Sequence, residues 1–364
     1  MNRRWLCNDV WMDIFPSFDH AQLGLKLALL SPRFNALVDT HFNGKSELTI
    51  WRQFAIRKDK GLEPKLSALF DGKSVEFPLP DDRPLPSKIR FKCLQISYID
   101  HSVINFLRSN QIFDKRGTNL HLLWLSSPHT TDGQLIWNVF VREIWPIFTT
   151  NICHLSFTGA DHLDNLRHLI SPTFLTDLNQ LVSIHSFGLL PDAIGADFDG
   201  PNATAGQALY KWLQTPRKDG QPKQLRCALF NEQAYFEWVN SFKEHFLRAN
   251  AISSVSYEIH FTVHSPSMPM MPFELVNEQT KEKLTLAKAK KTDNWIMKRC
   301  KIIGETEEIQ QQNIDENCGK WNNVFFLLFS GTNCIGPLSP PPPAKEDEAG
   351  QSITNGASSA DNDE

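Results

Sequence analysis

The segment Ile152-Cys153-His154-Leu155-Ser156-Phe157 is a short and nearly continuous apolar run, bounded by more polar residues on both sides. A helical pattern of apolar residues follows at Leu163–Leu169, and a second strand-like run follows at Val182–Phe187. Strands of a mostly parallel sheet are apolar on both faces, because helices cover such sheets. The stretch therefore predicts a β-strand, a helix and a parallel β-strand, and with them an α/β fold class.

The same alternation extends outward in both directions, over residues 89–261. Further strand candidates are Phe91–Tyr98, Asn119–Leu125, Gln224–Phe230 and Val255–Phe261. Further helix candidates are Ser102–Ile112, Gln134–Phe148 and Ala234–Ala249. The strands recur roughly every 30 residues, which is the period of a βα solenoid and exceeds the common leucine-rich range of about 20–29 residues. Leucines nevertheless crowd Asn119–Leu125, so we expect an irregular, leucine-rich-repeat-like βα solenoid.

Beyond the repeats, residues 272–330 predict extra strands. The stretch around Glu278–Lys281 is typical of a hairpin turn, and Asn294–Ile302 and Asn323–Phe329 are later strand candidates. From residue 336 to 364 the chain is rich in Pro and then in acidic and small polar residues. Such a composition builds no core, so this tail is predicted to be disordered.

Composition limits the partners that the chain is expected to bind. Its net charge is −4, and the tail from Pro337 onward holds six acidic residues and one lysine, which leaves the body near +1. A near-neutral body gives no general electrostatic reason to bind nucleic acid or an anionic membrane. The longest apolar run, Val324–Phe329, is too short to span a bilayer. Seven cysteines without a C-x-x-C pattern are typical of a reduced protein, so we expect a cytoplasmic or nuclear location.

The N-terminal segment predicts three short helices. Each has a candidate cap: Asn8 for the first, Asp19 for the second and Ser31 for the third. Gln22 stands three residues after Asp19, as in a capping box, and Pro32 follows Ser31 at the first helical position. The second helix is apolar nearly all round, and so small a unit has too little interior to bury it. Transfer of three or four of its large side chains onto a partner would supply on the order of 5–10 kcal/mol.

This segment resembles an F-box. The resemblance covers about the first 42 residues and runs from Leu6 and Asp9, through Ile14 and Phe15, to a closing Ser31-Pro32-Arg33-Phe34 signature. The sequence departs from the family pattern in two places, because Cys7 replaces the usual Pro and Pro16 lies in the region of the first helix. The layout of the body, including a Trp212–Pro216 turn, is similar to the diverse F-box families that are expanded in nematodes.

The resemblance implies three parts and a role for each. Residues 1–45 would be an F-box that binds a Skp-type linker and, through it, a cullin; residues 46–335 would be a body that presents an unidentified protein substrate for ubiquitination; and residues 336–364 would be the tail. The protein would itself be no enzyme, but the substrate receptor of a cullin-type ubiquitin ligase. The expected linker-binding residues are Leu6, Ile14, Phe15, Leu23, Leu27, Leu30, Phe34 and Leu37.

Motifs for catalysis are missing from the sequence, which agrees with that role. It contains no G-x-G-x-x-G, Walker A, G-x-S-x-G or H-E-x-x-H pattern, so no catalytic residue, cofactor or metal is expected. A lysine-rich stretch from Lys281 to Lys301 is an electrostatic footprint for nucleic acid or, more commonly, the solvated face of late strands.

Two alternatives remain open from the sequence. In the first, the body is a protein-binding module without a ligase role, and the N-terminal helices only cap the solenoid, as terminal repeats require. In the second, the βα array holds an enzyme site, with His154, Asp161 or His185 at the carboxyl edge of the sheet.

Overall fold

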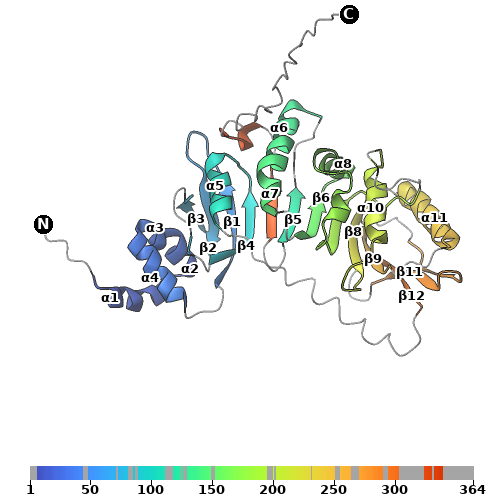
Figure 1. The fold of residues 1–364 in the computed structure, drawn as a ribbon, viewed down its shortest axis with the longest axis horizontal. Coiled ribbons are helices and arrows are strands. Elements are labelled where there is room, and N and C mark those ends of the chain that lie inside the picture. Colours follow the sequence, from blue (N-terminus) through green and yellow to red (C-terminus); the bar gives the residue numbers. More distant parts are fainter. Residues whose placement is uncertain are drawn as a thin grey trace, which may run out of the picture.

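The computed structural model describes residues 6–43, 48–70, 73–80, 85–86, 89–110, 118–123, 125, 129–148, 152–194, 200, 202–230, 232–250, 255–263, 270–289, 294–302, 324–329 and 332–338. The fold is α/β, with a mostly parallel sheet of 13 strands and a group of helices at the N-terminus. Figure 1 shows the N-terminal helices at one end of the sheet and the late strands at the other.

The N-terminal helices are α1 (Asn8–Ile14), η1 (Phe15–Ser17), α2 (His20–Gln22), η2 (Leu23–Leu27), α3 (Ala28–Leu30) and α4 (Pro32–Asn43). The strands are β1 (Leu48–Arg57), β2 (Lys65–Phe70), β3 (Lys73–Pro78), β4 (Ile89–Ile96), β5 (Thr118–Leu123), β6 (Ile152–Phe157), β7 (Ser183–Phe187), β8 (Lys223–Leu229), β9 (Tyr257–Val263), β10 (Phe273–Asn277), β11 (Glu282–Lys288), β12 (Trp295–Lys301) and β13 (Val324–Leu328). The later helices are α5 (His101–Ser109), α6 (Thr131–Val139), η3 (Phe140–Ile144), α7 (Trp145–Phe148), α8 (Ala160–Leu169), α9 (Phe174–Asp177), α10 (Ala205–Gln214), α11 (Glu232–Arg248) and η5 (Thr332–Cys334).

The strands lie in the order β10-β11-β12-β9-β8-β7-β6-β5-β13-β4-β1-β2-β3. Every neighbouring pair from β9 through to β1 is parallel, and antiparallel hairpins extend the sheet at both ends. Strands β5 to β9 follow one another in chain order, each joined to the next by a segment that contains a helix. Right-handed connections of this kind place all their helices on one side of a sheet, and Figure 1 shows the helices on one side.

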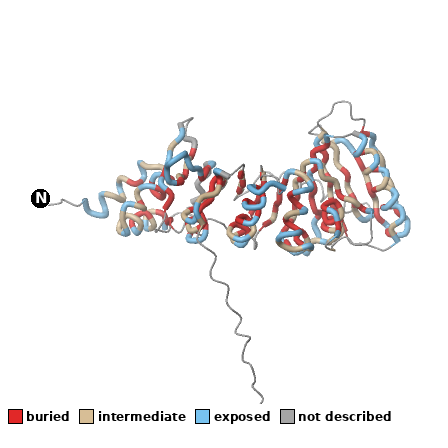
Figure 2. Tube along the Cα trace, turned by 90° about the horizontal axis from the view of Figure 1, so that it is seen from above, coloured by how far each residue is buried: buried red, intermediate tan, exposed pale blue. Residues whose placement is uncertain are grey.

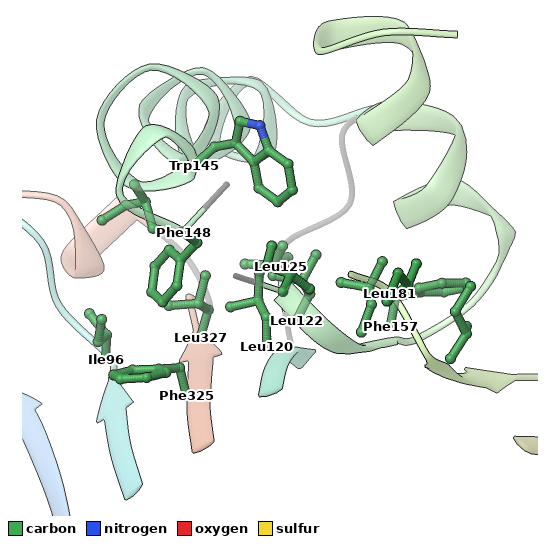
Figure 3. Packing of buried hydrophobic residues seen from close by; sticks show 14 of the residues in the cluster. Ile96, Leu120, Leu122, Leu125, Trp145, Phe148, Phe157, Leu181, Phe325 and Leu327 are labelled. Atoms are coloured by element: carbon green, nitrogen blue, oxygen red, sulfur yellow. The ribbon is translucent and has the colours of Figure 1, made fainter. Parts of the chain in front are cut away.

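One face of the sheet, here called the covered face, packs under the helices. On each strand its residues alternate with those of the opposite side, and they include Leu120, Leu155, Ile184, Leu225 and Ile259, which are all fully buried. In Figure 3, Phe148 of α7 lies over Phe325 and Leu327 of β13. The tube in Figure 2 shows the buried residues running through the length of the molecule. A single core therefore joins the strands, the intervening helices and the N-terminal helices.

The last strand in the chain lies in the middle of the sheet. β13 pairs in parallel with β4 on one side, through Phe325 opposite Leu94, and with β5 on the other, through Phe325 opposite Leu120. Phe325 and Leu327 are fully buried on the covered face, and the Phe325 ring meets Phe148 edge to face with centroids 5.3 Å apart. β13 thus joins the part of the sheet that is next to the N-terminal helices to the strands of the repeats.

The chain after β13 is hydrogen-bonded to the connection between β4 and α5. Ile99 N–H donates to the Cys334 carbonyl (2.8 Å), and Gly336 N–H donates back to the Ile99 carbonyl (2.8 Å). Gly336 lies so close to Tyr98 that an added Cβ would be 2.8 Å from Tyr98 Cζ and 2.9 Å from the Cβ of Asp100. A residue without a side chain is therefore required at this position.

The sequence predicted many of these elements. β6 has the predicted limits, and the predicted hairpin is formed by β10 and β11. The Asp19–Gln22 capping box and the Ser31 cap are confirmed, whereas Asn8 does not cap α1, because its side chain accepts hydrogen bonds from Arg33. The predicted Trp212–Pro216 turn is wrong over its first three residues, which form the last turn of α10. Strands β1 to β3 were not predicted, and the predicted tail lies outside the described residues beyond Leu338.

We expect Phe325→Ala to lower the free energy of unfolding by about 3–5 kcal/mol, because it leaves a cavity between β13 and α7. Urea unfolding measured by circular dichroism checks this. Phe326→Ala is the matched control, because Phe326 lies next in the same strand on the opposite face and is only partly buried. Equal losses in the two variants would contradict the central placement of β13.

Gly336→Ala should lower the stability by about 1–3 kcal/mol, because the new methyl group displaces the Tyr98 ring. The exposed neighbour Asn333 provides the control variant Asn333→Ala, which should change the melting temperature little. A Gly336→Ala protein as stable as the wild type would show that the segment after β13 does not pack there.

Candidate interaction surfaces

The N-terminal helices pack on the sheet with one side only. Leu23 and Leu25 of η2 are fully buried, and the ammonium group of Lys26 lies over the ring of Phe77 in β3, 5.2 Å from its centroid. Helix α1 behaves differently, because none of its seven residues is buried although it carries Val10, Trp11, Met12 and Ile14. An apolar helix that buries nothing completely is an unusual use of such side chains in a folded chain.

A hydrogen-bonded arginine holds the start of α1 against the start of α4. The guanidinium of Arg33 donates to the Leu6 carbonyl (2.8 Å) and to Asn8 Oδ1 (2.8 Å). The Trp11 indole meets the Phe34 ring edge to face, with centroids 4.9 Å apart. Leu6 is brought in this way to the same end of the helical unit as Leu30, which stands three residues before Arg33.

The eight predicted linker-binding residues fall into three groups. Leu6 and Leu30 are 49% and 64% exposed, and we use the name apolar end of the helices for these two residues and the exposed Val10. Ile14, Leu27 and Phe34 are partly buried. Phe15, Leu23 and Leu37 are buried within the chain itself. The structure thus brings the predicted residues into one small unit, and it leaves those of the apolar end accessible to a partner.

The second surface is the side of the sheet opposite the helices, here called the open face. Its central row crosses the strands in register: Phe326 of β13, His121 of β5, Ser156 of β6, His185 of β7, Arg226 of β8 and His260 of β9. The next row toward the amino ends of the strands holds Asn119, His154, Ser183, Gln224 and Glu258. The open face is therefore largely polar, but Asn119, His154, Ser156, Ser183 and Gln224 are buried among their neighbours. In the central row Arg226 is exposed, and His121, His185, His260 and Phe326 are partly buried.

Histidine rings stack along this face. The His121 ring is stacked on Phe326 (4.7 Å between centroids) and lies 5.3 Å from the His154 ring, and the His185 ring is stacked on Phe187 (4.5 Å). Burial lowers the pKa of His121 to about 4, aided by the nearby His185, and lowers that of His154 to about 3. Burial and the charge of Arg226 also lower the pKa of His185. These imidazoles are consequently neutral at pH 7.

Sequence reasoning did not place these histidines together on one face of the sheet. The signal was present, because polar residues alternate with apolar ones in Asn119–Leu122, Cys153–Phe157 and Gln224–Cys227. Alternation of this kind indicates a strand with one exposed or polar face. The prediction of strands that are apolar on both faces makes no use of this alternation.

The arrangement offers little support for chemistry at the carboxyl edge. His154 and His185 lie inside β6 and β7 rather than at their ends, and Asp161 is an exposed residue in the first turn of α8. Within the described residues, no three His, Cys, Asp or Glu side chains lie together so as to hold a metal ion.

The lysine-rich stretch is largely matched by carboxylates. Lys298 Nζ lies 3.2 Å from Glu258, Lys281 Nζ lies 3.1 Å from Glu278, and Lys283 Nζ lies 3.9 Å from Glu274. Arg299 is buried and pairs with the fully buried Glu282 at 2.6 Å. Lys290 and Lys291 lie outside the described residues. The described part of the stretch thus carries little unbalanced positive charge.

The stacked histidines predict a loss of stability in acid. Their pKa values are lower in the folded than in the unfolded state, so the unfolded chain gains more protons as the pH falls below about 6.5. Each fully shifted histidine should cost about 2 kcal/mol of unfolding free energy between pH 7 and pH 5. His154→Gln should flatten this dependence in urea unfolding, whereas the exposed His168→Gln should not. An unchanged slope in His154→Gln would contradict the burial of a neutral imidazole.

Comparison with known proteins gives no match: no family model, no curated protein and no solved structure is similar to the chain. No helix in the described part of the chain has the length and the apolar character needed to cross a membrane.

Proposed function

We propose that this chain is a non-catalytic adaptor of a cullin-type ubiquitin ligase. Its N-terminal helices would act as an F-box that docks on a Skp-type linker, and its irregular, leucine-rich-repeat-like body would hold a protein substrate. The observation that carries the proposal is the apolar end of the helices, where Leu6, Val10 and Leu30 are exposed while the opposite side of the unit packs on the sheet.

A purely structural role explains this surface less well. Helices that only cap a solenoid bury their apolar face on the sheet and turn a polar face to water. Here η2 buries its leucines in that way, but α1 and Leu30 do not. Because Leu6 and Leu30 are already partly buried, covering the rest of both would favour binding by about 2–3 kcal/mol, which is enough to contribute to a stable complex.

The described cysteines also fit the proposal. Cys7, Cys93, Cys153, Cys227, Cys300 and Cys334 are all free thiols. Burial raises the pKa of Cys227 to about 12, so this thiol stays protonated and unreactive. Free, unreactive cysteines are typical of the reducing cytosol or nucleus, where a cullin ligase acts.

The test is a pull-down of the full chain with purified Skp-type linker and cullin. The double variant Leu6→Asp, Leu30→Asp should reduce linker capture at least roughly tenfold, because it places two carboxylates in an apolar interface. Both side chains are largely exposed, so the melting temperature should stay near that of the wild type.

A matched control places the same substitutions elsewhere. Leu135 and Leu247 are 48% and 49% exposed on α6 and α11, and Leu135→Asp, Leu247→Asp should leave capture unchanged. Linker capture that is equal in the two double variants would overturn the docking surface. If the wild-type chain captures no linker, and removal of residues 1–43 unfolds the body, the helices are a cap.

A further inference from the structure

Arg226 is the one residue of the central open-face row that always carries a positive charge. It stands between His185 of β7 and His260 of β9 in the register of the sheet, and its side chain is exposed. Within the described residues, its guanidinium makes no hydrogen bond or ion pair. Glu258, the carboxylate on the adjacent strand, instead lies 3.2 Å from Lys298 Nζ and 3.4 Å from His260 Nε2.

An apolar shelf lies toward the carboxyl ends of the strands; its member nearest to Arg226 is Phe187 on the neighbouring strand β7, whereas Leu123 and Leu328 lie three and four strands from β8. It consists of Leu328, Leu123 and Phe187, which project from the open side of β13, β5 and β7 by the alternation of the strands and are only partly buried. Phe187 is one strand and two residues away from Arg226, because Phe187 pairs with Ala228. Strand spacing places such positions about 8 Å apart, which is close to the separation of alternate side chains in an extended peptide.

From this juxtaposition we infer that the open face binds an extended peptide segment of a partner protein, in which a carboxylate side chain meets Arg226 and a large apolar side chain two residues away meets the shelf. Peptide binding to the open face does not require the proposed function. Only the identification of the bound partner as the ligase substrate rests on it. Arginine is suited to the role, because its planar guanidinium can hold a carboxylate through two parallel hydrogen bonds.

A nucleic acid is a poorer fit to the same surface, although aromatic rings and an arginine are also used to bind bases. Affinity for a phosphate backbone grows with the number of neutralised phosphates, so it requires several free cations. On the described open face, Lys298 is paired with Glu258, and His121, His154 and His185 are held neutral by burial. A single carboxylate matches one guanidinium that has no ion pair among the described residues.

The proposal is tested with purified full chain and fluorescent decapeptide pools. In each pool one central position is fixed as either Glu or Gln. The position two residues after it is fixed as either Leu or Ser, and all other positions are randomised. The Glu/Leu pool should bind at least roughly tenfold more tightly than the Gln/Leu and the Glu/Ser pools. Arg226→Gln should remove the preference for Glu, Phe187→Ser should weaken the preference for Leu, and Arg248→Gln, a change to an exposed arginine on α11, should alter neither.

Equal binding of all pools, or an unaltered preference for Glu in a folded Arg226→Gln protein, would overturn the proposal. So would tighter binding of a single-stranded oligonucleotide than of any peptide pool. Thermal unfolding of each variant identifies those that fail to fold. Because no linker is present in this measurement, its failure leaves the docking test of the helices unaffected, and failure of the docking test leaves the peptide result valid.

Discussion

The pairing of β13 with β4 and β5 is the interaction on which the rest of the structure depends. β4 belongs to the part of the sheet that supports the N-terminal helices, β5 opens the series of parallel repeats, and β13 carries the hydrogen bonds between them. Phe325 and Leu327 then place α7 over this junction, as Figure 3 shows. The distance between the apolar end of the helices and the open face is therefore fixed by a strand from the far end of the sequence. In an adaptor that holds a substrate near an enzyme, such a fixed distance determines which lysines can be reached.

The two faces of the sheet differ in chemistry. The covered face is aliphatic and provides the core, while the open face carries imidazoles whose pKa values are lowered by burial, so that they stay neutral. Neutral rings are compatible with dense packing across parallel strands, whereas a row of cations would repel one another. Arg226 is the exception, because its guanidinium stays charged and its side chain is exposed. Any selectivity of this face for a ligand would therefore come from the single charge of Arg226, which lies among aromatic rings.

Local patterns in the sequence predicted the repeats, because apolar runs such as those of β6 and β7 reflect burial directly. They did not place β13, since Val324–Leu328 has the composition of any central strand and its neighbours are chosen by contacts across more than 200 residues. β1 was missed because Arg52 and Gln53 interrupt its apolar alternation. For the candidate site, the apolar residues of the N-terminal helices were identifiable, but the exposure of Leu30 and the burial of Leu37 depend on how these helices pack. The partners of Arg226 are likewise set by the register of three strands.

The position of β13 also has a consequence during synthesis. The edge of β5 is complete when Leu123 has left the ribosome, but its partner begins about 200 residues later, which corresponds to roughly 10–40 s of translation. For that interval the facing edges of β4 and β5 would lack their shared partner, and unpaired strand edges are the kind of surface that joins with other chains. Chaperone capture and aggregation would compete with folding until the final strand is inserted. The amount of usable protein in a cell would then depend on translation speed as much as on the stability of the finished fold.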